Sequence, residues 1–280
     1  MMLINKCWET TDFLGSGATG VIFNAKHKDD NTKRVAIKLF NEGRTKQYTQ
    51  ELKVHQLMAG VPGFTNIHDY GKDNEQLFIV MDLLGSDLYN SNEHIENVYV
   101  QMLHRLRDLH SKGIVHNDVK QSNFVYNREN TIVYLIDFDI SSKYTTSLKP
   151  LDVKNTQPIL LINGIQHIQI EMDPRVPIKG TYKYSSVNVL RGISPSPRDD
   201  LESLGYVIIS MIKELPWNTD GIIKRKDKIK FAEEKAVVDL ESLTANTIPG
   251  MFEYMKIVRN LDYYEIPPYD KLEQLLNKNN

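Results

Sequence analysis

The pattern of hydrophobic and polar positions changes near residue 85. Before this point, short apolar segments alternate with polar turns, as at residues 21–23, 34–40 and 76–81. Segments of this length, bounded by glycine, proline and asparagine, are typical of β-strands. A helical pattern over roughly residues 46–58 interrupts them. The first part of the chain is therefore predicted to be rich in strands, with one main helix.

After residue 85 the pattern becomes mostly helical. Apolar residues recur at helical spacing over residues 99–110, and Gly113 follows where a helix would end. Residues 200–212 form a strongly apolar segment that predicts a buried helix. Residues 141–179 are predicted to be a long loop. Its apolar stretch 158–170 is expected to form a hairpin that either packs locally or receives a partner.

This change of pattern predicts two lobes. A length of 280 residues suits one large domain or two lobes that share a cleft. We predict an α+β fold in a single domain over residues 1–280. It consists of a small β-rich N-lobe over 1–83 and a larger α-helical C-lobe over 84–280.

The composition excludes several classes of protein. Hydrophobic residues make up 41% and charged residues 25%, so the chain can form a sizeable core. A formal net charge of −2 gives no indication of nucleic-acid binding. The apolar run 206–212 is far shorter than the ~20 residues that span a bilayer, and we expect no membrane association.

The single cysteine, Cys7, rules out an internal disulfide framework and suits a reducing compartment. We therefore expect an intracellular, cytoplasmic protein. We also expect it to be a monomer. A basic run at residues 224–228 is either a nuclear-import signal or a solvated basic helix face, which leaves a nuclear location open.

A glycine-rich segment, Gly15-Ser-Gly-Ala-Thr-Gly20, lies between two predicted strands. A dinucleotide-binding fold would require a helix after these glycines, so that fold is disfavoured. The segment is either an ordinary hairpin or a flap whose backbone N–H groups close over phosphates.

Lys38 lies in the apolar strand segment Val35-Ala-Ile-Lys38, where an ammonium group is costly unless it is paired. The phosphates of a nucleotide would supply the opposite charge, and Glu51 on the following helix would hold the lysine in place. A lone Lys–Glu pair is usually a weak surface contact. Beside a glycine flap, the two residues indicate a phosphate clamp.

The most informative segment is His116-Asn-Asp-Val-Lys-Gln-Ser-Asn123. Asp118 would orient an acceptor hydroxyl or take its proton, and Lys120 would neutralise charge on a transferring phosphoryl group. Asn123 offers an oxygen to a hard cation such as Mg²⁺. Asp137, in Ile136-Asp-Phe-Asp139, is the expected chief metal ligand. Together these residues predict phosphoryl transfer with ATP and Mg²⁺.

These motifs resemble the eukaryotic protein kinases. The segments 180–188, 198–206 and 215–217 are most similar to the casein kinase 1 family, and those at 51–55 and 81–85 also resemble it. That family has Ser-Ile-Asn where most kinases have Ala-Pro-Glu, and here Ser186-Val-Asn188 stands at this place. The vaccinia-related kinases are the second-closest match.

The resemblance implies a set of nucleotide-binding residues. Met81 would be the gatekeeper, and the backbone of Asp82 and Leu84 would bind adenine. The implied set is Leu14, Gly15, Ser16, Gly17, Gly20, Ile22, Ala36, Lys38, Met81, Asp82, Leu84, Val125 and Asp137.

The resemblance also implies roles in substrate binding. Asp200 would anchor the catalytic loop, and Thr181 would contact Asp118 and Lys120, which favours serine or threonine as acceptor. Casein kinase 1 enzymes prefer acidic or phosphorylated sites, so the same preference is expected here, with Lys183 and Lys230 in a basic pocket. The alternative for these two residues is a pair of ordinary surface lysines.

Two positions depart from the kinase pattern. Asn117 replaces the arginine that commonly binds a phosphorylated activation loop, so we expect activity without phosphorylation of residues 141–179. Asp139 replaces a glycine and could strain the backbone or alter cation binding. These two departures leave a nucleotide-binding pseudokinase as one alternative to a protein kinase. A kinase-like phosphotransferase that acts on a small molecule is the other alternative.

Overall fold

The computed structural model describes residues 1–88, 97–147, 160–162, 164–217 and 228–277. Contacts divide the chain into two compact units. The first contains Met1–Glu93 and Phe124–Ile140, and the second contains His94–Asn123 and Ser141–Asn280. Residues 124–140 thus belong with the N-terminal residues, although a boundary between 83 and 84 would assign them to the second lobe.

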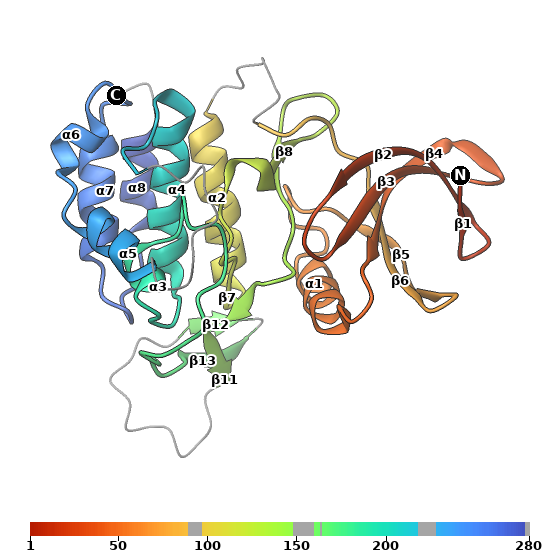
Figure 1. Ribbon diagram of the computed structural model, residues 1–280, viewed down its shortest axis with the longest axis horizontal. Coiled ribbons are helices and arrows are strands. Elements are labelled where there is room, and N and C mark those ends of the chain that lie inside the picture. Colours follow the sequence, from red (N-terminus) through yellow and green to blue (C-terminus); the bar gives the residue numbers. More distant parts are fainter. Residues whose placement is uncertain (89–96, 148–159, 163, 218–227, 278–280) are drawn as a thin grey trace. The chain divides into compact units, whose positions relative to one another are not determined.

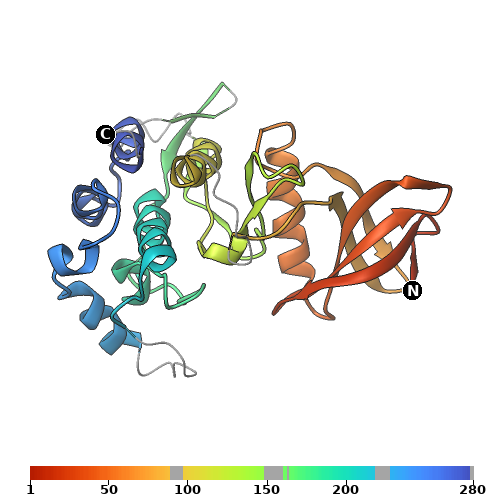
Figure 2. The ribbon, with the colours of Figure 1, turned by 90° about the horizontal axis from the view of Figure 1, so that it is seen from above.

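The first unit is built on a six-stranded antiparallel sheet with the order β1-β2-β3-β4-β6-β5. Helix α1 (Thr45–Leu57) packs alongside it, against β6 (Figures 1 and 2). The strands are β1 (Leu3–Ile4), β2 (Trp8–Ser16), β3 (Gly20–His27), β4 (Asp30–Phe40), β5 (Ile67–Asp73) and β6 (Gln76–Asp82).

Strand β4 explains where the core of this unit lies. Its side chains alternate between the two faces of the sheet. Val35, Ile37 and Leu39 join one buried cluster, and Ala36 and Phe40 join the other. By the same alternation, Lys38 belongs to the face of Ala36 and Phe40.

Two further strands belong to the first unit. Strands β8 (Phe124–Tyr126) and β9 (Val133–Leu135) form an antiparallel pair. The pair lies between the two motifs that predict chemistry, and Asp137 is the second residue after the end of β9.

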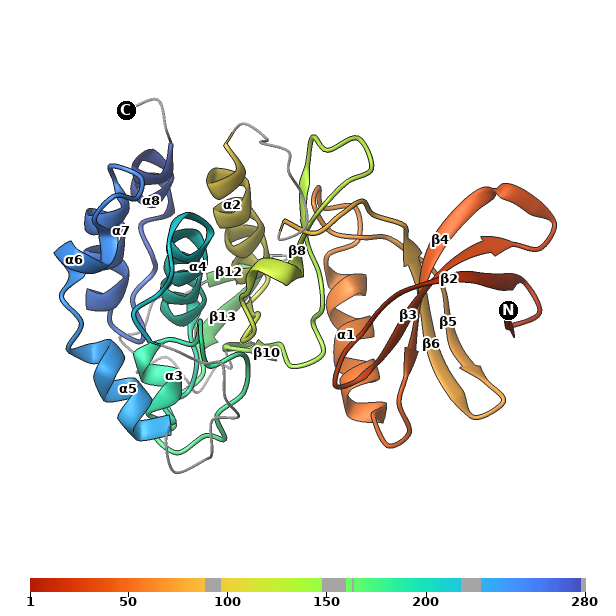
Figure 3. The same cartoon turned by 45° about the horizontal axis from the view of Figure 1, so that its top comes forward.

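The second unit is mainly helical. Helices α2, α4, α7 and α8 lie side by side (Figures 1 and 3), and the predicted mixed α+β fold is confirmed. The helices of this unit are α2 (Val98–Ser111), α3 (Val187–Leu190), α4 (Pro197–Ile212), α5 (Lys228–Ala236), α6 (Leu240–Thr244), α7 (Met251–Asn260) and α8 (Tyr269–Leu276), with a 3₁₀ turn, η1, at Gln121–Asn123. Of the helices described, none is long and apolar enough to cross a membrane.

Helix α4 begins three residues before its predicted start. Ser196 and Asp199 form a capping box, in which each side chain bonds the backbone of the other, and Pro197 occupies the first turn. Nearly every residue from Pro197 to Ile209 is buried, which explains the uninterrupted apolar character of this segment.

The prediction of a loop over residues 141–179 is wrong in part. Strand β10 (Ser142–Lys143) pairs with β7 (Ile114–Val115), and a three-stranded sheet has the order β11-β13-β12. Its strands are β11 (Thr145–Ser147), β12 (Leu160–Ile162) and β13 (Ile165–Gln169). The expected hairpin is therefore present, although residues 158, 159 and 163 lie outside the described residues.

This hairpin packs locally in part. Ile162 and Ile168 are buried, whereas Leu161 and Ile165 are exposed. A Cβ at Gly113, where φ is +75°, would lie 2.9 Å from a methyl carbon of Ile162. Glycine at 113 therefore allows the hairpin to approach the end of α2. The sequence prediction failed because these strands are only two to five residues long.

We expect two flap glycines to differ in their effect on stability. A Cβ at Gly20 would lie 2.1 Å from the carbonyl oxygen of Leu39 in β4, whereas at Gly17 it would meet no described heavy atom within 4 Å. Gly20→Ala should lower the free energy of unfolding by about 3 kcal/mol, and Gly17→Ala should change it by less than about 0.5 kcal/mol. Urea denaturation measures both, and equal effects would contradict the strand pairing of β3 with β4.

Candidate active site

The predicted site residues fall into two groups, one in each compact unit. All the predicted nucleotide-binding residues, from Leu14 to Asp137, lie in the first unit. Asp118, Lys120, Asn123, Thr181 and Asp200 lie in the second.

The first group is centred on Lys38. Its ammonium lies 2.7 Å from Oε2 of Glu51 on α1 and 2.8 Å from Oδ1 of Asp137 after β9. Lys38 and Glu51 are buried, but the side chain of Asp137 is 32% exposed. Three elements distant in sequence thus bring one cation and two carboxylates together, and Asp137 is the carboxylate that a ligand can reach.

Burial and charge act in opposite directions on these groups. Burial alone would lower the pKa of Lys38, but the carboxylates of Glu51 and Asp137 raise it well above its ordinary value. Lys38 is therefore charged. Burial raises the pKa of Glu51 to about 7, against the opposing effect of Lys38. Lys38 thus lowers the pKa of Glu51, which would otherwise stay protonated at neutral pH.

A buried aromatic contact supports this group. Phe138 is fully buried, meets the ring of His55 edge-on at 5.1 Å and stacks on Phe64 at 6.0 Å. Burial lowers the pKa of His55 to about 4, so His55 is neutral at pH 7. The sequence analysis did not identify His55, although it lies one helical turn after Glu51.

The concern that Asp139 strains the backbone is not supported. Asp137 has the left-handed conformation, with φ of 68°, and Asp139 does not have a positive φ. Aspartate tolerates this region better than most residues do. Asp139 therefore does not occupy a backbone conformation that requires glycine.

The glycine segment is a strand–turn–strand flap, as predicted. Gly15 pairs with Ile22 between β2 and β3, and the N–H of Gly17 donates to the carbonyl of Gly20 at 2.9 Å. Among the described residues, no heavy atom lies within 4 Å of a Cβ built on Gly15 or Gly17. Packing therefore does not require glycine at these two positions, whereas close approach of a ligand to the backbone would.

Three apolar residues of the predicted nucleotide-binding set, Ile22, Ala36 and Met81, lie on the face of the sheet that carries Lys38. Ala36 and Met81 are buried in one cluster, with Ile22 packed against it. Val125 is buried in β8, and Leu14 is 50% exposed at the flap.

Asp82 and Leu84 follow Met81 at the end of β6. The side chain of Asp82 is engaged by Asn66 at 2.8 and 2.9 Å and by His68 at 2.7 Å. These contacts fix its direction, which favours a backbone role for Asp82, while Leu84 is half-buried.

The second group is centred on Asp118. One carboxylate oxygen accepts hydrogen bonds from the backbone N–H and the hydroxyl of Thr181, at 2.8 and 2.7 Å. The other oxygen lies 2.6 Å from the ammonium of Lys120. Asn123 donates its side-chain N–H to the backbone carbonyl of Asp118 at 2.9 Å, so its own oxygen is the atom suited to a cation. The predicted contact between Thr181 and Asp118 is present.

Asp200 on α4 anchors this segment. Its carboxylate accepts backbone N–H bonds from His116 at 2.6 Å and from Asn117 at 3.0 Å, and a side-chain bond from His110 at 2.9 Å. Burial would raise the pKa of Asp200, but the hydrogen bonds from the two histidines lower it below its ordinary value. Asp200 therefore stays ionised and holds the backbone just before Asp118.

Asn117 fits its place without strain. It has a left-handed backbone, with φ of 69°, which asparagine adopts readily. Its side-chain N–H donates to the hydroxyl of Ser142 at 2.9 Å. Asn117 thus fastens the start of the 141–179 segment by a neutral contact.

Comparison with known proteins agrees with this geometry. The sequence profile described as Protein kinase domain matches residues 8–261. The chain belongs to the protein kinase domain family. The Lys38 group and the Asp118 group are therefore parts of a kinase domain, and the family predicted from the motifs is confirmed.

Three relatives are casein kinase I homologues of Schizosaccharomyces pombe, which confirms the predicted branch. Homolog 1 is 30% identical over 282 residues, covering 95% of this chain and 59% of that protein. Homolog 2 is 30% identical over 280 residues, covering 94% of this chain and 60% of that protein. Homolog 3 is 28% identical over 280 residues, covering 94% of this chain and 60% of that protein. The kinase domain described here spans about three-fifths of the length of these relatives.

The side chains predicted to hold Mg²⁺ offer donors that suit this ion, although protein groups alone do not complete a site. The described residues contain no group of three or more His, Cys, Asp or Glu side chains that could hold a metal by themselves. Mg²⁺ is commonly held by one or two carboxylates together with phosphate oxygens and water. Each of the two predicted ligands has an oxygen of the kind that Mg²⁺ binds: the reachable carboxylate of Asp137 in the first unit, and the amide oxygen of Asn123 in the second.

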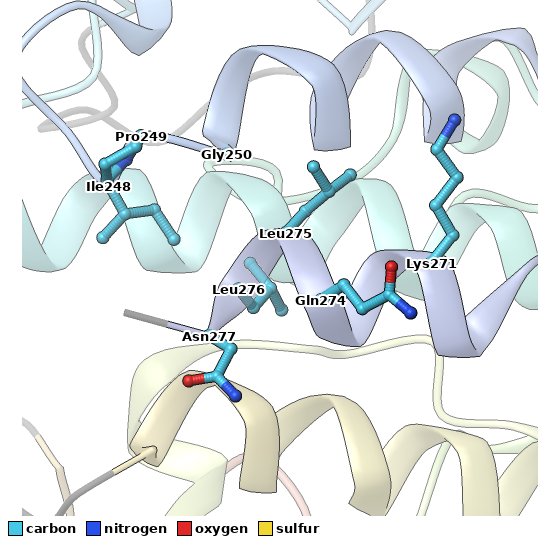
Figure 4. A pocket seen from close by; sticks show the side chains of 8 residues that line it. All are labelled: Ile248, Pro249, Gly250, Lys271, Gln274, Leu275, Leu276 and Asn277. Atoms are coloured by element: carbon cyan, nitrogen blue, oxygen red, sulfur yellow. The ribbon is translucent and has the colours of Figure 1, made fainter. Parts of the chain in front are cut away.

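A cavity of about 350 Å³ lies elsewhere in the second unit (Figure 4). It is lined by residues 248–250 and 274–277 with Lys271, at the start of α7 and the end of α8. None of these lining residues belongs to either group of predicted site residues, so we assign it no role in phosphoryl transfer.

We expect the stability of a Lys38→Met variant to fall as pH rises. Without the ammonium, Glu51 is protonated in the folded state at neutral pH, whereas in the unfolded chain it loses its proton near its ordinary pKa of 4.5. The folded state then holds more protons, so the free energy of unfolding falls by up to about 1.4 kcal/mol per pH unit. Denaturant unfolding between about pH 5 and pH 8 measures this slope.

The control for this measurement is the double variant Lys38→Met/Glu51→Gln. Glutamine has nearly the shape of the protonated acid but does not titrate, so the additional slope should disappear. Identical slopes in the two variants would show that Glu51 does not depend on Lys38 for its charge.

Proposed function

We propose that this chain is an ATP-dependent serine/threonine protein kinase. The observation that carries the proposal is the buried ammonium of Lys38, bound at 2.7 and 2.8 Å by Glu51 and Asp137. Membership of the protein kinase domain family supports it. The S. pombe relatives are named casein kinase I, which supports the same activity here.

The two groups of residues would have different roles in catalysis. In the first, Lys38 would neutralise nucleotide phosphates, the flap backbone would cover them, and Asp137 would hold Mg²⁺. Asn123, in the second group, would be the other metal ligand. When bound, Mg²⁺ supplies positive charge to the phosphate oxygens. Glu51 would keep Lys38 in place.

In the second group, Asp118 would orient the acceptor hydroxyl and accept its proton. Lys120, 2.6 Å from Asp118, would offset the negative charge of the transferring group. Thr181 would hold one oxygen of Asp118 through two hydrogen bonds, so that the other is directed toward Lys120 and the acceptor.

The direct test is transfer of radiolabelled phosphate from ATP to casein. We expect Asp118→Asn to lower kcat by about a hundredfold or more, because the amide cannot accept the proton. Nucleotide affinity should not change, since the proposed nucleotide residues lie in the first unit. Asp29→Asn, in an exposed turn, is the matched control.

The outcomes distinguish the alternatives. Nucleotide binding without transfer by the wild-type chain would support a pseudokinase scaffold. Transfer to small acceptors but never to protein would support a small-molecule phosphotransferase. Full activity of Asp118→Asn would refute the role of that residue.

We also propose a preference for acidic or phosphorylated sites, with Lys183 and Lys230 as the binding residues. Lys230 on α5 has a side chain that is 80% exposed, and the ammonium of Lys183 lies 5.6 Å from the ring centre of Tyr184. Both are accessible cations in the second unit. The neighbouring basic run 224–228, the possible nuclear-import signal, lies almost entirely outside the described residues. The nuclear location, the cytoplasmic location and the monomeric state therefore stay predictions.

Charge reversal tests this preference. In Lys183→Glu/Lys230→Glu, the ratio of kcat/KM for a peptide with an upstream phosphoserine to that for the unphosphorylated peptide should fall about tenfold, because charge-assisted hydrogen bonds are lost. Lys256→Glu/Lys271→Glu carries the same change in net charge and should keep the wild-type ratio. Retention of that ratio by the first variant would contradict the proposal.

We expect activity without phosphorylation of residues 141–179. Asn117 cannot form the charged fork through which arginine binds phosphate, and it already bonds Ser142. Phosphatase-treated protein, shown by mass spectrometry to carry no phosphate, should keep its kcat on casein. Loss of activity that returns on rephosphorylation would refute this expectation.

A further inference from the structure

Lys235 is a fully buried lysine that the proposed mechanism does not use. It lies on α5 on the same side as the buried residues Phe231 and Ala232, whereas Lys230 and Glu233 on this helix are exposed. Helix α5 packs against α3 (Figures 1 and 3). A buried lysine is costly unless all its N–H groups find partners, so its contacts indicate a specific purpose.

The ammonium of Lys235 binds three backbone carbonyls. Its nitrogen lies 3.0 Å from the oxygen of Tyr182, 3.1 Å from that of Lys183 and 2.7 Å from that of Ser185. Three acceptors match the three N–H groups of a charged ammonium, whereas a neutral amine has only two. Although burial lowers the pKa of Lys235, this geometry favours the charged form.

Aromatic rings enclose the same ammonium. It lies 4.6 Å from the ring centre of Tyr206, 4.8 Å from that of Trp217 and 5.2 Å from that of Phe231. Such distances allow cation–π attraction, which offsets part of the cost of burial. Trp217 also donates its ring N–H to the carbonyl of Lys183 at 2.9 Å. The carbonyl of Lys183 therefore accepts two hydrogen bonds, one from Lys235 and one from Trp217.

The segment held by Lys235 is continuous with the contacts of Asp118. The carbonyl of Thr181 accepts the backbone N–H groups of Tyr184 and Ser185, at 2.9 and 3.0 Å, which closes a turn over 181–185. Thr181 itself makes the two hydrogen bonds to Asp118. Without the ammonium, the carbonyl groups of this turn would lose their hydrogen-bond partner. Thr181 would then no longer be held in the orientation that it needs to bind Asp118.

We propose that Lys235 is a positioning residue for the protein acceptor. Its caged ammonium fixes the turn 181–185, and through it the orientation of Asp118 and the backbone that carries Lys183. This inference rests on the proposed kinase activity. It predicts an effect on the protein substrate and none on the nucleotide, because the proposed nucleotide residues lie in the first unit.

The test compares Lys235→Met, which keeps the length of the side chain but has no donor, with Lys235→Gln, which keeps two N–H donors. For a casein-derived peptide, kcat/KM should fall about 10- to 100-fold in the methionine variant and less in the glutamine variant. The KM for ATP should stay at the wild-type value in both. Lys256→Met, on the exposed side of α7, is the matched control with the same loss of charge.

Hydrogen exchange gives a readout that does not depend on catalysis. Backbone amides of 181–187 should exchange faster in Lys235→Met than in the control, while those of the flap at 15–20 stay unchanged. If the wild-type chain transfers no phosphate but exchange changes in this way, the proposed activity fails and the positioning role stands. Unchanged exchange over 181–187, or a peptide kcat/KM equal to that of Lys256→Met in both Lys235 variants, would overturn it. If the methionine variant does not fold, the glutamine variant decides by the same criteria.

Discussion

A charged ammonium on an apolar face of a sheet is the constraint on which the first unit depends. Lys38 shares its face of β4 with Ala36 and Phe40, and it can remain there only because two carboxylates reach it. One comes from α1 and the other from the segment after β9. The need to pair this charge therefore fixes the helix and the returning segment against the sheet.

The second unit uses buried charge to hold backbone. The Asp200 carboxylate gathers the N–H groups of His116 and Asn117, and the Lys235 ammonium gathers the carbonyls of Tyr182, Lys183 and Ser185. One ion fixes the segment that carries Asp118 and the other fixes the segment that carries Thr181. Each charge has hydrogen-bond partners that replace water, which is the condition for burying an ion without large cost.

Much of the fold could be predicted because its pattern is local. The alternation in β4 places Lys38 on a buried face, and the helical spacing of α2 and α4 is long enough to be distinctive. Strand β5 was not predicted, since its residues alternate between half-buried and exposed and include glycine and several charges. The short strands of 142–169 were missed as well. Strand β10, for example, pairs with the distant residues Ile114 and Val115, and such pairing leaves no pattern in the local sequence.

The predicted site residues were found through sequence motifs. The residues that hold them in place, such as Lys235, were not found in this way. Lys38, Glu51 and Asp118 lie in segments with recognisable spacing. Lys235 resembles a surface lysine in sequence, because α5 is rich in charged residues and its partners are carbonyl groups without side-chain identity. The local signs are Phe231 and Ala232, four and three residues earlier on the same side of the helix.

The most direct test of this account is a crystal structure of the chain with Mg²⁺ and a non-hydrolysable ATP analogue. In that structure the Lys38 ammonium should contact the α- or β-phosphate while Glu51 stays bound to it. Asp137 should coordinate the metal, and the backbone of 15–20 should cover the phosphates. A nucleotide bound away from Lys38, or a Lys38 that contacts no phosphate while Asp137 holds no metal, would contradict it.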